Sequence, residues 1–272
     1  MEIKPRYPIY IPSKGRPNSP TARCFMKYGV DFRIGVEPQD EEAYRKNFGD
    51  KVLVLPFSNL GKGSIPSRNF GREWSESLGA KRHWDIDDNI CNFYRWFNSH
   101  RDRVSPAIAL SACEDFTDAY SNIAISGLEY AMFATPTSKF VPYALNTKVY
   151  SCTLVNNELP FKWRGRYNED TDLCLQALTA GYCTVLIKQF LSDKMATMTM
   201  KGGNSDELYK NDGRLKMAQE LQRNWQQFVT IKHRFKRPQH VVNWKIFKTQ
   251  LILKPDTERP MQRVNDLTLC DR

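Results

Sequence analysis

The sequence lacks the features that mark several large classes of protein. Its 272 residues contain no apolar run of about 18 residues, which argues against a membrane-spanning helix. The first six residues lack the apolar core of a secretory signal peptide. No internal repeat and no low-complexity tract is visible. We therefore expect a globular protein in the cytoplasm.

Metal-binding cysteine spacing is also absent. The seven cysteines form no CxxC or CxH pair and are scattered over Cys24, Cys91, Cys113, Cys152, Cys174, Cys183 and Cys270. An odd, dispersed set in a chain without a secretion signal is typical of reduced thiols that mostly serve in packing. Structural zinc is therefore not expected.

Positive charge is abundant and unevenly distributed. The net charge is +10, and residues 201–254 hold twelve Lys and Arg against four Asp and Glu. Aromatic residues such as Trp225 and Phe235 lie among these cations. A basic segment with interleaved aromatics suits a phosphate backbone and stacked bases. The alternative is a basic helix that is solvated, or whose Lys and Arg stems cover its own core.

The first half of the chain alternates strand and helix patterns. Apolar runs predict strands at 7–11, 32–36 and 52–55 and one ending in the acidic residues from Asp85, and capped segments predict helices at 20–28, 38–49 and 64–78. With 41% hydrophobic residues, the chain can bury a sizeable core. The order predicts an α/β fold with a mainly parallel mixed sheet flanked by helices.

The second half is more mixed. Helices are expected at 105–120 and 168–180, and strands near 123–125, 148–155 and 183–187. We expect one α/β domain over residues 1–204, a basic helical extension packed on it over 205–254, and a weakly structured tail over 255–272.

An acidic cluster follows the last strand of the first half. Asp85, Asp87 and Asp88 end an apolar-aromatic run, so they are expected at the carboxyl edge of the sheet, where α/β proteins bind ligands. Three adjacent carboxylates repel one another unless something neutralises them. A divalent cation on a nucleotide diphosphate does so, because Mg²⁺ and Mn²⁺ sites use one or two carboxylates together with phosphate oxygens and water. A solvated acidic turn is the alternative.

Three further segments could hold a nucleotide. Each offers cations, hydroxyls or glycines that approach phosphates closely. They comprise Pro12, Ser13, Lys14 and Arg16 after the first strand, Arg68 and Asn69 early in a helix, and Lys201, Gly202, Gly203 and Asn204 after a strand-like run. Ordinary basic or flexible turns and a surface arginine are the alternatives.

Acidic residues also open the helix expected at 168–180. Asn168 is a good N-cap, and acids in the first turn suit the helix dipole, which is a sufficient structural reason for them. The functional interpretation is that Asp170, or Glu169, takes a proton from an acceptor hydroxyl. The dipole lowers the pKa of Asp170 and neighbouring carboxylates raise it, so the sequence leaves that pKa open.

Taken together, these segments resemble the TET-associated glycosyltransferases, bacteriophage enzymes whose genes accompany TET-type DNA oxygenases. The resemblance covers nearly all of residues 7–254. It rests on the blocks at 9–16, 36–38, 83–89, 149–154, 163–175, 197–204 and 237–242, in that order. Runs of this length are far more specific than an Asp-x-Asp pair alone.

The resemblance implies a GT-A fold and a nucleotide-sugar donor, for which we expect a UDP-sugar, with Mn²⁺ or Mg²⁺ as cofactor. It also implies sugar transfer to a hydroxymethylated pyrimidine in DNA, with 5-hydroxymethylcytosine expected. We place the metal on Asp87 and Asp88 and group Asp85 with the donor-binding residues; Asp193 or water would supply a third ligand. The expected DNA contacts are Arg164, Arg166, Lys232, Arg234, Lys236, Arg237 and His240.

Alternative functions remain open at this stage. A nucleotidyltransferase could use the same sheet and carboxylates but would release pyrophosphate. A non-catalytic DNA-binding protein would keep the basic segment and make the carboxylates dispensable. An enzyme modifying cell-surface glycans would gain nothing from the basic segment. The sugar, the anomeric outcome and the oligomeric state are not predicted.

Overall fold

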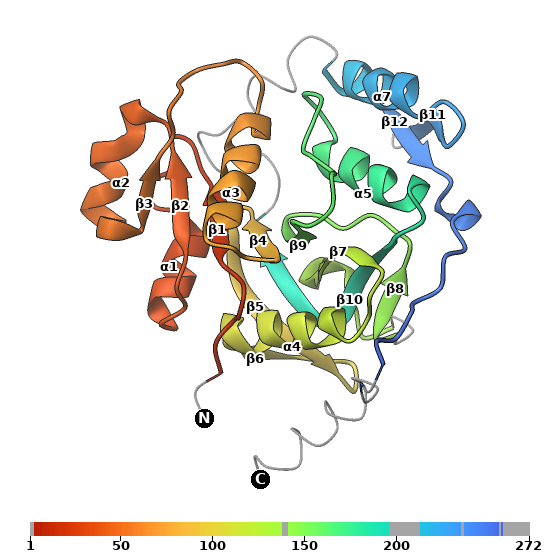
Figure 1. The fold of residues 1–272 in the computed structure, drawn as a ribbon, viewed down its shortest axis with the longest axis horizontal. Helices are drawn as coiled ribbons and strands as arrows, with labels where there is room; N and C mark the ends of the chain where they lie inside the picture. Colours follow the sequence, from red (N-terminus) through yellow and green to blue (C-terminus); the bar gives the residue numbers. More distant parts are fainter. Residues whose placement is uncertain (1–2, 138–140, 196–212, 235–236, 256, 258–272) are drawn as a thin grey trace.

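The computed structural model describes residues 3–137, 141–195, 213–234, 237–255 and 257 (Figure 1). A ten-stranded mixed sheet has the order β3-β2-β1-β4-β9-β7-β10-β5-β6, with β8 paired to β10. Its strands are β1 (Ile9–Pro12), β2 (Arg33–Val36), β3 (Val52–Val54), β4 (Arg82–Ile86), β5 (Ile90–Phe97), β6 (His100–Val104), β7 (Ile123–Tyr130), β8 (Tyr143–Leu145), β9 (Cys152–Asn156) and β10 (Cys183–Lys194). The helices against it are α1 (Pro20–Lys27), α2 (Glu41–Phe48), α3 (Ile65–Ser77), α4 (Pro106–Asp118) and α5 (Glu169–Thr179).

The predicted parallel half is present. β1 pairs in parallel with β2 and β4, and β2 pairs in parallel with β3. The other half is mixed, because β9 runs antiparallel between β4 and β7 while β7 and β10 are parallel. Residues 90–104, for which no strand was predicted, form the β5–β6 hairpin. Its turn residues Asn98 and Ser99 both have positive φ, as a two-residue hairpin turn requires.

The two faces of the sheet carry different side chains. On β4, Trp84 and Ile86 belong to the large core shared with α1, α2 and α4. The alternating positions Asp85 and, just beyond the strand, Asp87 point to the other face, where both bond with Arg68 of α3. α5 packs on that same face, and it shares a second apolar cluster with Ile65 of α3. The carboxylates therefore lie between α3 and α5.

Close packing fixes the position of α3 over β1. Tyr10 of β1 is fully buried, and its hydroxyl shares a hydrogen bond of 2.8 Å with Ser67. A Cβ atom at Gly71 of α3 or at Gly35 of β2 would overlap the Tyr10 ring. Glycine at these positions lets helix and strands approach the ring from both sides, and this seats Arg68 above the end of β4.

The C-terminal segment packs on α5. It contains α7 (Gly213–Asn224), then the antiparallel hairpin of β11 (Val229–Arg234) and β12 (Arg237–Val242). Leu175 of α5 forms a small core with Leu221 and Val229. The segment is therefore less helical than predicted: Val229 and Ile231 alternate with polar residues in the first arm, and the second arm ends in two valines, which favour a strand.

Some predicted features lie outside the described residues. These include the domain boundary at 204/205, the strand-like run at 197–200 and most of the tail over 255–272. Within the part of the chain that is described, no helix is long and apolar enough to cross a membrane.

Candidate active site

The acidic cluster is neutralised by side chains of the protein itself. Arg68 bonds with Asp85 and, at 2.6 Å, with Asp87 Oδ1. Lys194, the last residue of β10, donates to Asp87 Oδ2 at 2.7 Å. Arg16 donates to Asp88 Oδ1 at 2.8 Å. The repulsion that the sequence suggested is thus relieved by three cations, each carried by a different segment.

Asp85 is a buried residue that supports the site through Arg68. Its side chain has no exposed surface and bonds with Arg68, and its Oδ2 has no hydrogen-bond partner among the described residues. Its contact with a donor nucleotide stays a prediction that this burial does not favour. Asp85 instead fixes the guanidinium of Arg68, which reaches the site surface.

The loop after β1 folds against Asp88. Ser13 donates to Asp88 Oδ2 at 2.6 Å, and the backbone N–H of Arg16 donates to the Tyr44 hydroxyl at 2.7 Å. Lys14 forms an ion pair of 2.9 Å with Glu37. Burial raises the pKa of Asp88, and the Arg16 guanidinium opposes that rise. The predicted loop residues and Asp88 therefore lie together.

Lys194 continues the network beyond the acidic cluster. Its ammonium group also donates to Ser151 Oγ at 2.9 Å and lies 5.7 Å from the centre of the Tyr130 ring. Burial raises the pKa of Asp87, but the charges of Lys194 and Arg68 outweigh burial and hold that pKa well below its usual range. The two cations therefore favour the ionised form of Asp87.

Two tyrosines form the next part of the site. The Tyr130 hydroxyl shares a hydrogen bond with Ser151, and the Tyr150 hydroxyl donates to buried Glu129. The two ring centres are 4.4 Å apart. Lys148 lies 5.6 Å from the centre of the Tyr150 ring. Each ring is thus fixed by the hydrogen bond of its hydroxyl and by contact with the other ring.

Lys148 connects the tyrosines to the start of α5. It forms an ion pair of 2.9 Å with Asp170, and Arg68 Nε lies 3.7 Å from Glu169. The contacts therefore close on themselves, and we call this set the contact circuit. Its members are Asp87, Lys194, Ser151, Tyr130, Tyr150, Lys148, Asp170, Glu169 and Arg68.

The two acids at the start of α5 have opposite electrostatics. Burial raises the pKa of Glu169, and the neighbouring Asp170 adds to the rise while Arg68 opposes it. Burial also raises the pKa of Asp170, but the Lys148 ammonium and the Thr171 N–H outweigh burial and lower it overall. Of the two acids, only Glu169 has its pKa shifted toward neutral pH, the direction that suits a proton acceptor.

Backbone conformations that non-glycine residues seldom adopt occur at this site. Ser151 has φ of 61° and Asn168 has φ of 55°. The carbonyl of Ser151 accepts from the Asp87 N–H at 2.7 Å, and Asn168 immediately precedes Glu169. Such backbone strain concentrates where a protein must hold functional groups in place.

The chain is similar to known proteins in sequence and in fold. The sequence model of the TET-Associated Glycosyltransferase family matches residues 7–203. The chain belongs to this family. The predicted resemblance and the predicted GT-A-like α/β fold are thereby confirmed, and the protein is a glycosyltransferase. No match was found among the curated proteins.

Two solved structures are similar to this chain. The inositol-1-phosphate CTP transferase from T. maritima is 10% identical, with a TM-score of 0.40 over 71% of this chain and 90% of that one. The mannose-1-phosphate geranyltransferase from Thermus thermophilus is 12% identical, with a TM-score of 0.32 over 66% of this chain and 57% of that one.

The remaining donor-site predictions for this glycosyltransferase have mixed outcomes. Asn69 donates to the Trp163 carbonyl at 2.8 Å and accepts from the Trp163 N–H at 3.1 Å, so its amide holds the segment before α5. Its contact with a nucleotide stays a prediction. Lys201, Gly202, Gly203 and Asn204 lie outside the described residues.

A divalent cation would find hard oxygen donors in the glycosyltransferase. Asp87 has the most exposed carboxylate of the acidic cluster, and buried Asn89 has an amide oxygen without a hydrogen-bond partner among the described residues. No group of three or more His, Cys, Asp or Glu in that part of the chain is arranged to hold a metal. The oxygens of Asp87 and Asp88 suit Mg²⁺ or Mn²⁺ when a diphosphate supplies the other ligands.

The predicted DNA contacts fall into two groups. Arg164 forms an ion pair of 2.8 Å with Asp172, and the backbone N–H of Arg166 donates to Glu220 at 3.1 Å, so both lie where the loop meets α5 and α7. Lys232 and Arg237 are exposed on the hairpin, His240 is partly buried in β12, and the side chains of Arg234 and Lys236 are outside the described part.

His240 lies closer to the contact circuit than its sequence position suggested. Burial lowers its pKa to about 4, with the charge of Lys148 lowering it further and Asp170 opposing. His240 is therefore within electrostatic reach of the Lys148–Asp170 ion pair and is neutral near pH 7. The hairpin thus brings the basic segment to the edge of the site.

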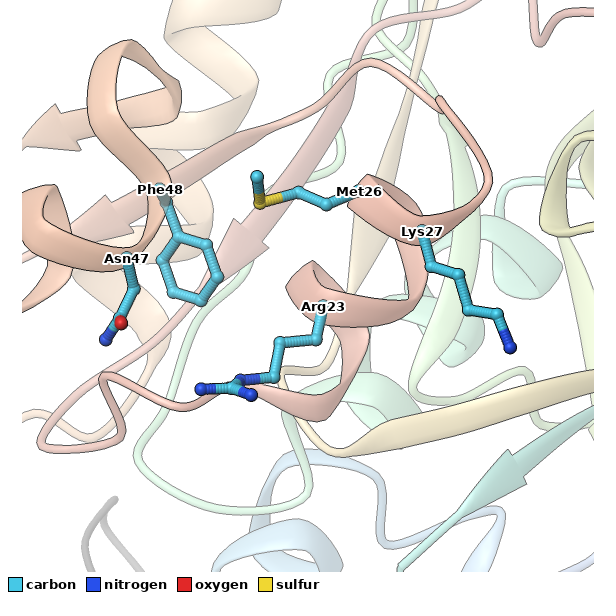
Figure 2. Close-up of a pocket in the computed structure, with 5 residues that line it drawn as sticks. All are labelled: Arg23, Met26, Lys27, Asn47 and Phe48. Atoms are coloured by element: carbon cyan, nitrogen blue, oxygen red, sulfur yellow. The ribbon is translucent and has the colours of Figure 1, made fainter.

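A separate pocket lies between α1 and α2. It has a volume of about 520 Å³ and is lined by Arg23, Met26, Lys27, Asn47 and Phe48 (Figure 2). None of the predicted site residues lines it, and no carboxylate is present. We therefore do not assign the donor to this pocket.

Several residues of the contact circuit were not predicted from the sequence. Lys194, Lys148 and Tyr130 lie outside the blocks that carry the family resemblance, and Tyr150 lies in one of them but was given no role. Lys194 in particular lies seven residues beyond the predicted end of its strand, because β10 continues past a register shift after Ile187. Only the pairing of β10 with β5 and β7 brings it to Asp87.

Proposed function

We propose that the protein transfers a sugar from a nucleotide-sugar, expected to be a UDP-sugar, to the hydroxymethyl group of 5-hydroxymethylcytosine in DNA. The observation that carries this proposal is the contact circuit, in which Arg68 bonds with Asp87 of the acidic cluster and with Glu169. A donor diphosphate bound at the acidic cluster would therefore have a proton acceptor beside it. Such juxtaposition is what glycosyl transfer to a hydroxyl needs.

Donor binding is assigned to the cations around the acidic cluster. Arg16, Lys194 and Arg68 all surround Asp87 and Asp88; Arg16 and Lys194 can turn to phosphate oxygens, and Arg68 adds positive charge from its fixed position. Asp87 and Asp88 would hold Mn²⁺ or Mg²⁺, which supplies Lewis-acid stabilisation of the departing diphosphate. Ser13 and Lys14 border the same edge and complete the proposed nucleotide site.

Proton transfer is assigned to Glu169. The hydroxymethyl oxygen attacks the anomeric carbon and gives its proton to Glu169, while the bond between that carbon and the diphosphate oxygen breaks. The raised pKa of Glu169 suits this role better than the lowered pKa of Asp170. We assign Asp170 to positioning Lys148 through their ion pair. Direct attack with a carboxylate base would invert the anomeric configuration.

Acceptor binding is assigned to the C-terminal hairpin. Exposed Lys232 and Arg237 can contact phosphates, and partly buried His240 lies within electrostatic reach of Lys148 and Asp170. In duplex DNA the hydroxymethyl group projects into the major groove, so base flipping is not obligatory. The net charge of +10 favours association with DNA at low salt.

Mass spectrometry of nucleosides tests the proposal. DNA containing cytosine, 5-hydroxymethylcytosine or 5-hydroxymethyluracil is incubated with the protein, Mn²⁺ and a panel of UDP-sugars, then digested to nucleosides. We expect a hexose or pentose mass increment on 5-hydroxymethylcytosine and none on cytosine. An increment on 5-hydroxymethyluracil alone would overturn the assigned acceptor. If no base gains mass with any donor, the assignments of 5-hydroxymethylcytosine as acceptor and of a UDP-sugar as donor are both overturned.

A further inference from the structure

Lys194 occupies the position on Asp87 that a divalent cation would take. Its Nζ atom lies 2.7 Å from Asp87 Oδ2 and 2.9 Å from Ser151 Oγ. The other oxygen of Asp87 accepts from Arg68 at 2.6 Å. Both oxygens of this carboxylate therefore already carry a positive partner, so a divalent cation placed there would be repelled from two sides.

Of these two cations, Lys194 is the one able to leave. Arg68 is buried and is also bound by Asp85 and Glu169, so its release would strand a fully buried carboxylate. Lys194 forms an ion pair with Asp87 alone among the described residues, on a flexible four-carbon stem. Its side chain is 19% exposed, so its ammonium group can reach a ligand at the surface.

We infer that Lys194 is the resident counter-ion of Asp87 and makes metal binding depend on the donor. In the absence of donor it holds Asp87 Oδ2 and keeps the divalent cation off. The negative diphosphate attracts the ammonium group away from Asp87, and the freed oxygen then accepts the cation. This inference rests on the proposed nucleotide-sugar donor. It predicts that metal and nucleotide bind together, with Lys194 on the phosphates.

Binding of Mn²⁺ itself tests the inference without any turnover. The signal of free Mn²⁺ is measured by electron paramagnetic resonance with wild type and Lys194→Met, without and with UDP, and protein-free samples correct for the UDP complex. We expect Lys194→Met to bind Mn²⁺ alone about tenfold more tightly than wild type, since a competing charge is gone. UDP should strengthen Mn²⁺ binding about tenfold in wild type and much less in this variant.

Matched variants keep the test specific. Lys188→Met removes a lysine from the same strand, where Lys188 lies 3.7 Å from Glu129, and should bind Mn²⁺ like wild type. Lys194→Arg keeps the charge and should keep the weak binding without UDP. Asp87→Asn should abolish Mn²⁺ binding. Thermal unfolding followed by circular dichroism verifies that each variant is folded.

Two results would overturn the inference. One is equal affinity of wild type and Lys194→Met for Mn²⁺ alone, and the other is no Mn²⁺ binding in any variant even with UDP. Neither decides the proposed function, because sugar incorporation into DNA is measured separately. If sugar is incorporated while Lys194→Met binds Mn²⁺ like wild type, the proposed function stands and the role of Lys194 is wrong.

Discussion

Replacement of Arg68 by Met should destabilise the folded protein strongly. Arg68 bonds with fully buried Asp85, with Asp87 at 2.6 Å and with Glu169 at 3.7 Å. Methionine preserves much of the volume of the side chain but leaves these carboxylates without their shared cation. Removal of one partner from a buried ion pair costs about 3–5 kcal/mol, which is a large part of the stability of a single domain.

The expected shift is measurable by thermal or urea unfolding followed by circular dichroism. For a chain of this size the loss corresponds to a Tm lower by about 6–20 °C. Arg45→Met is the matched control, because Arg45 pairs with Glu41 at 2.6 Å on the surface of α2. An exposed pair of this kind contributes less than about 1 kcal/mol.

A second substitution separates charge from packing. Asp85→Asn in the Arg68→Met background removes the stranded negative charge, so the double variant should be more stable than Arg68→Met alone. If Arg68→Met unfolds at the same temperature as Arg45→Met, Arg68 does not neutralise a buried carboxylate. If the double variant is no more stable than Arg68→Met, the loss comes from packing and not from charge.

Three further outcomes are expected. Burial is the largest cause of the raised pKa of Glu169 and the charge of Asp170 adds to it, so Asp170→Asn should move the acidic limb of the kcat/KM profile to lower pH, where Glu169 then stays deprotonated. Trp225→Phe removes the indole N–H that donates to Asp172 at 2.7 Å, and should lower stability by about 1–3 kcal/mol and speed proteolysis of the C-terminal segment. Lys232→Gln should weaken DNA binding in gel-shift titrations and reduce the salt slope by about 1 if the lysine contacts one phosphate.

One control variant and two contradicting results apply to these three predictions. Lys46→Gln removes one exposed charge from α2 and should leave the salt slope of DNA binding unchanged. An unchanged acidic limb in Asp170→Asn would contradict the role given to Glu169. Proteolysis of Trp225→Phe at the wild-type rate would contradict the docking of the C-terminal segment through Asp172.

Local pattern was sufficient to predict the parallel half of the sheet. The predicted helix at 20–28 is α1 (Pro20–Lys27), because Ser19 caps it and Pro20 begins it. The helix at 168–180 is α5 (Glu169–Thr179), although the expected N-cap Asn168 makes no capping hydrogen bond with its side chain; the acids of its first turn suit the helix dipole. The β5–β6 hairpin was missed because its first arm is rich in aromatic and polar residues without strict alternation, and its strand identity comes from pairing with β10.

The acidic residues of the candidate site and its arginines Arg16 and Arg68 were predicted from the sequence, whereas its two lysines were missed. Asp87, Asp88 and Glu169 follow or open predicted elements, so their place at the sheet edge could be inferred. Their partners Lys194 and Lys148 come from distant segments, and lysine is too common on surfaces to mark a site by itself. The charge balance of the site is a tertiary property, so the lysine that pairs with Asp87 could not be predicted from the sequence, and the metal on Asp87 and Asp88 stays a prediction.

Sugar incorporation by site variants tests the central claim most directly. Wild type, Asp87→Asn and Glu169→Gln are incubated with 5-hydroxymethylcytosine DNA, Mn²⁺ and UDP-sugars, with Glu42→Gln on the exposed face of α2 as control. Nucleosides are then analysed by mass spectrometry. We expect a sugar increment with wild type and Glu42→Gln, and a loss of at least about 100-fold with the two site variants. Wild-type incorporation by Asp87→Asn and Glu169→Gln would contradict the assignment of the active site to the contact circuit.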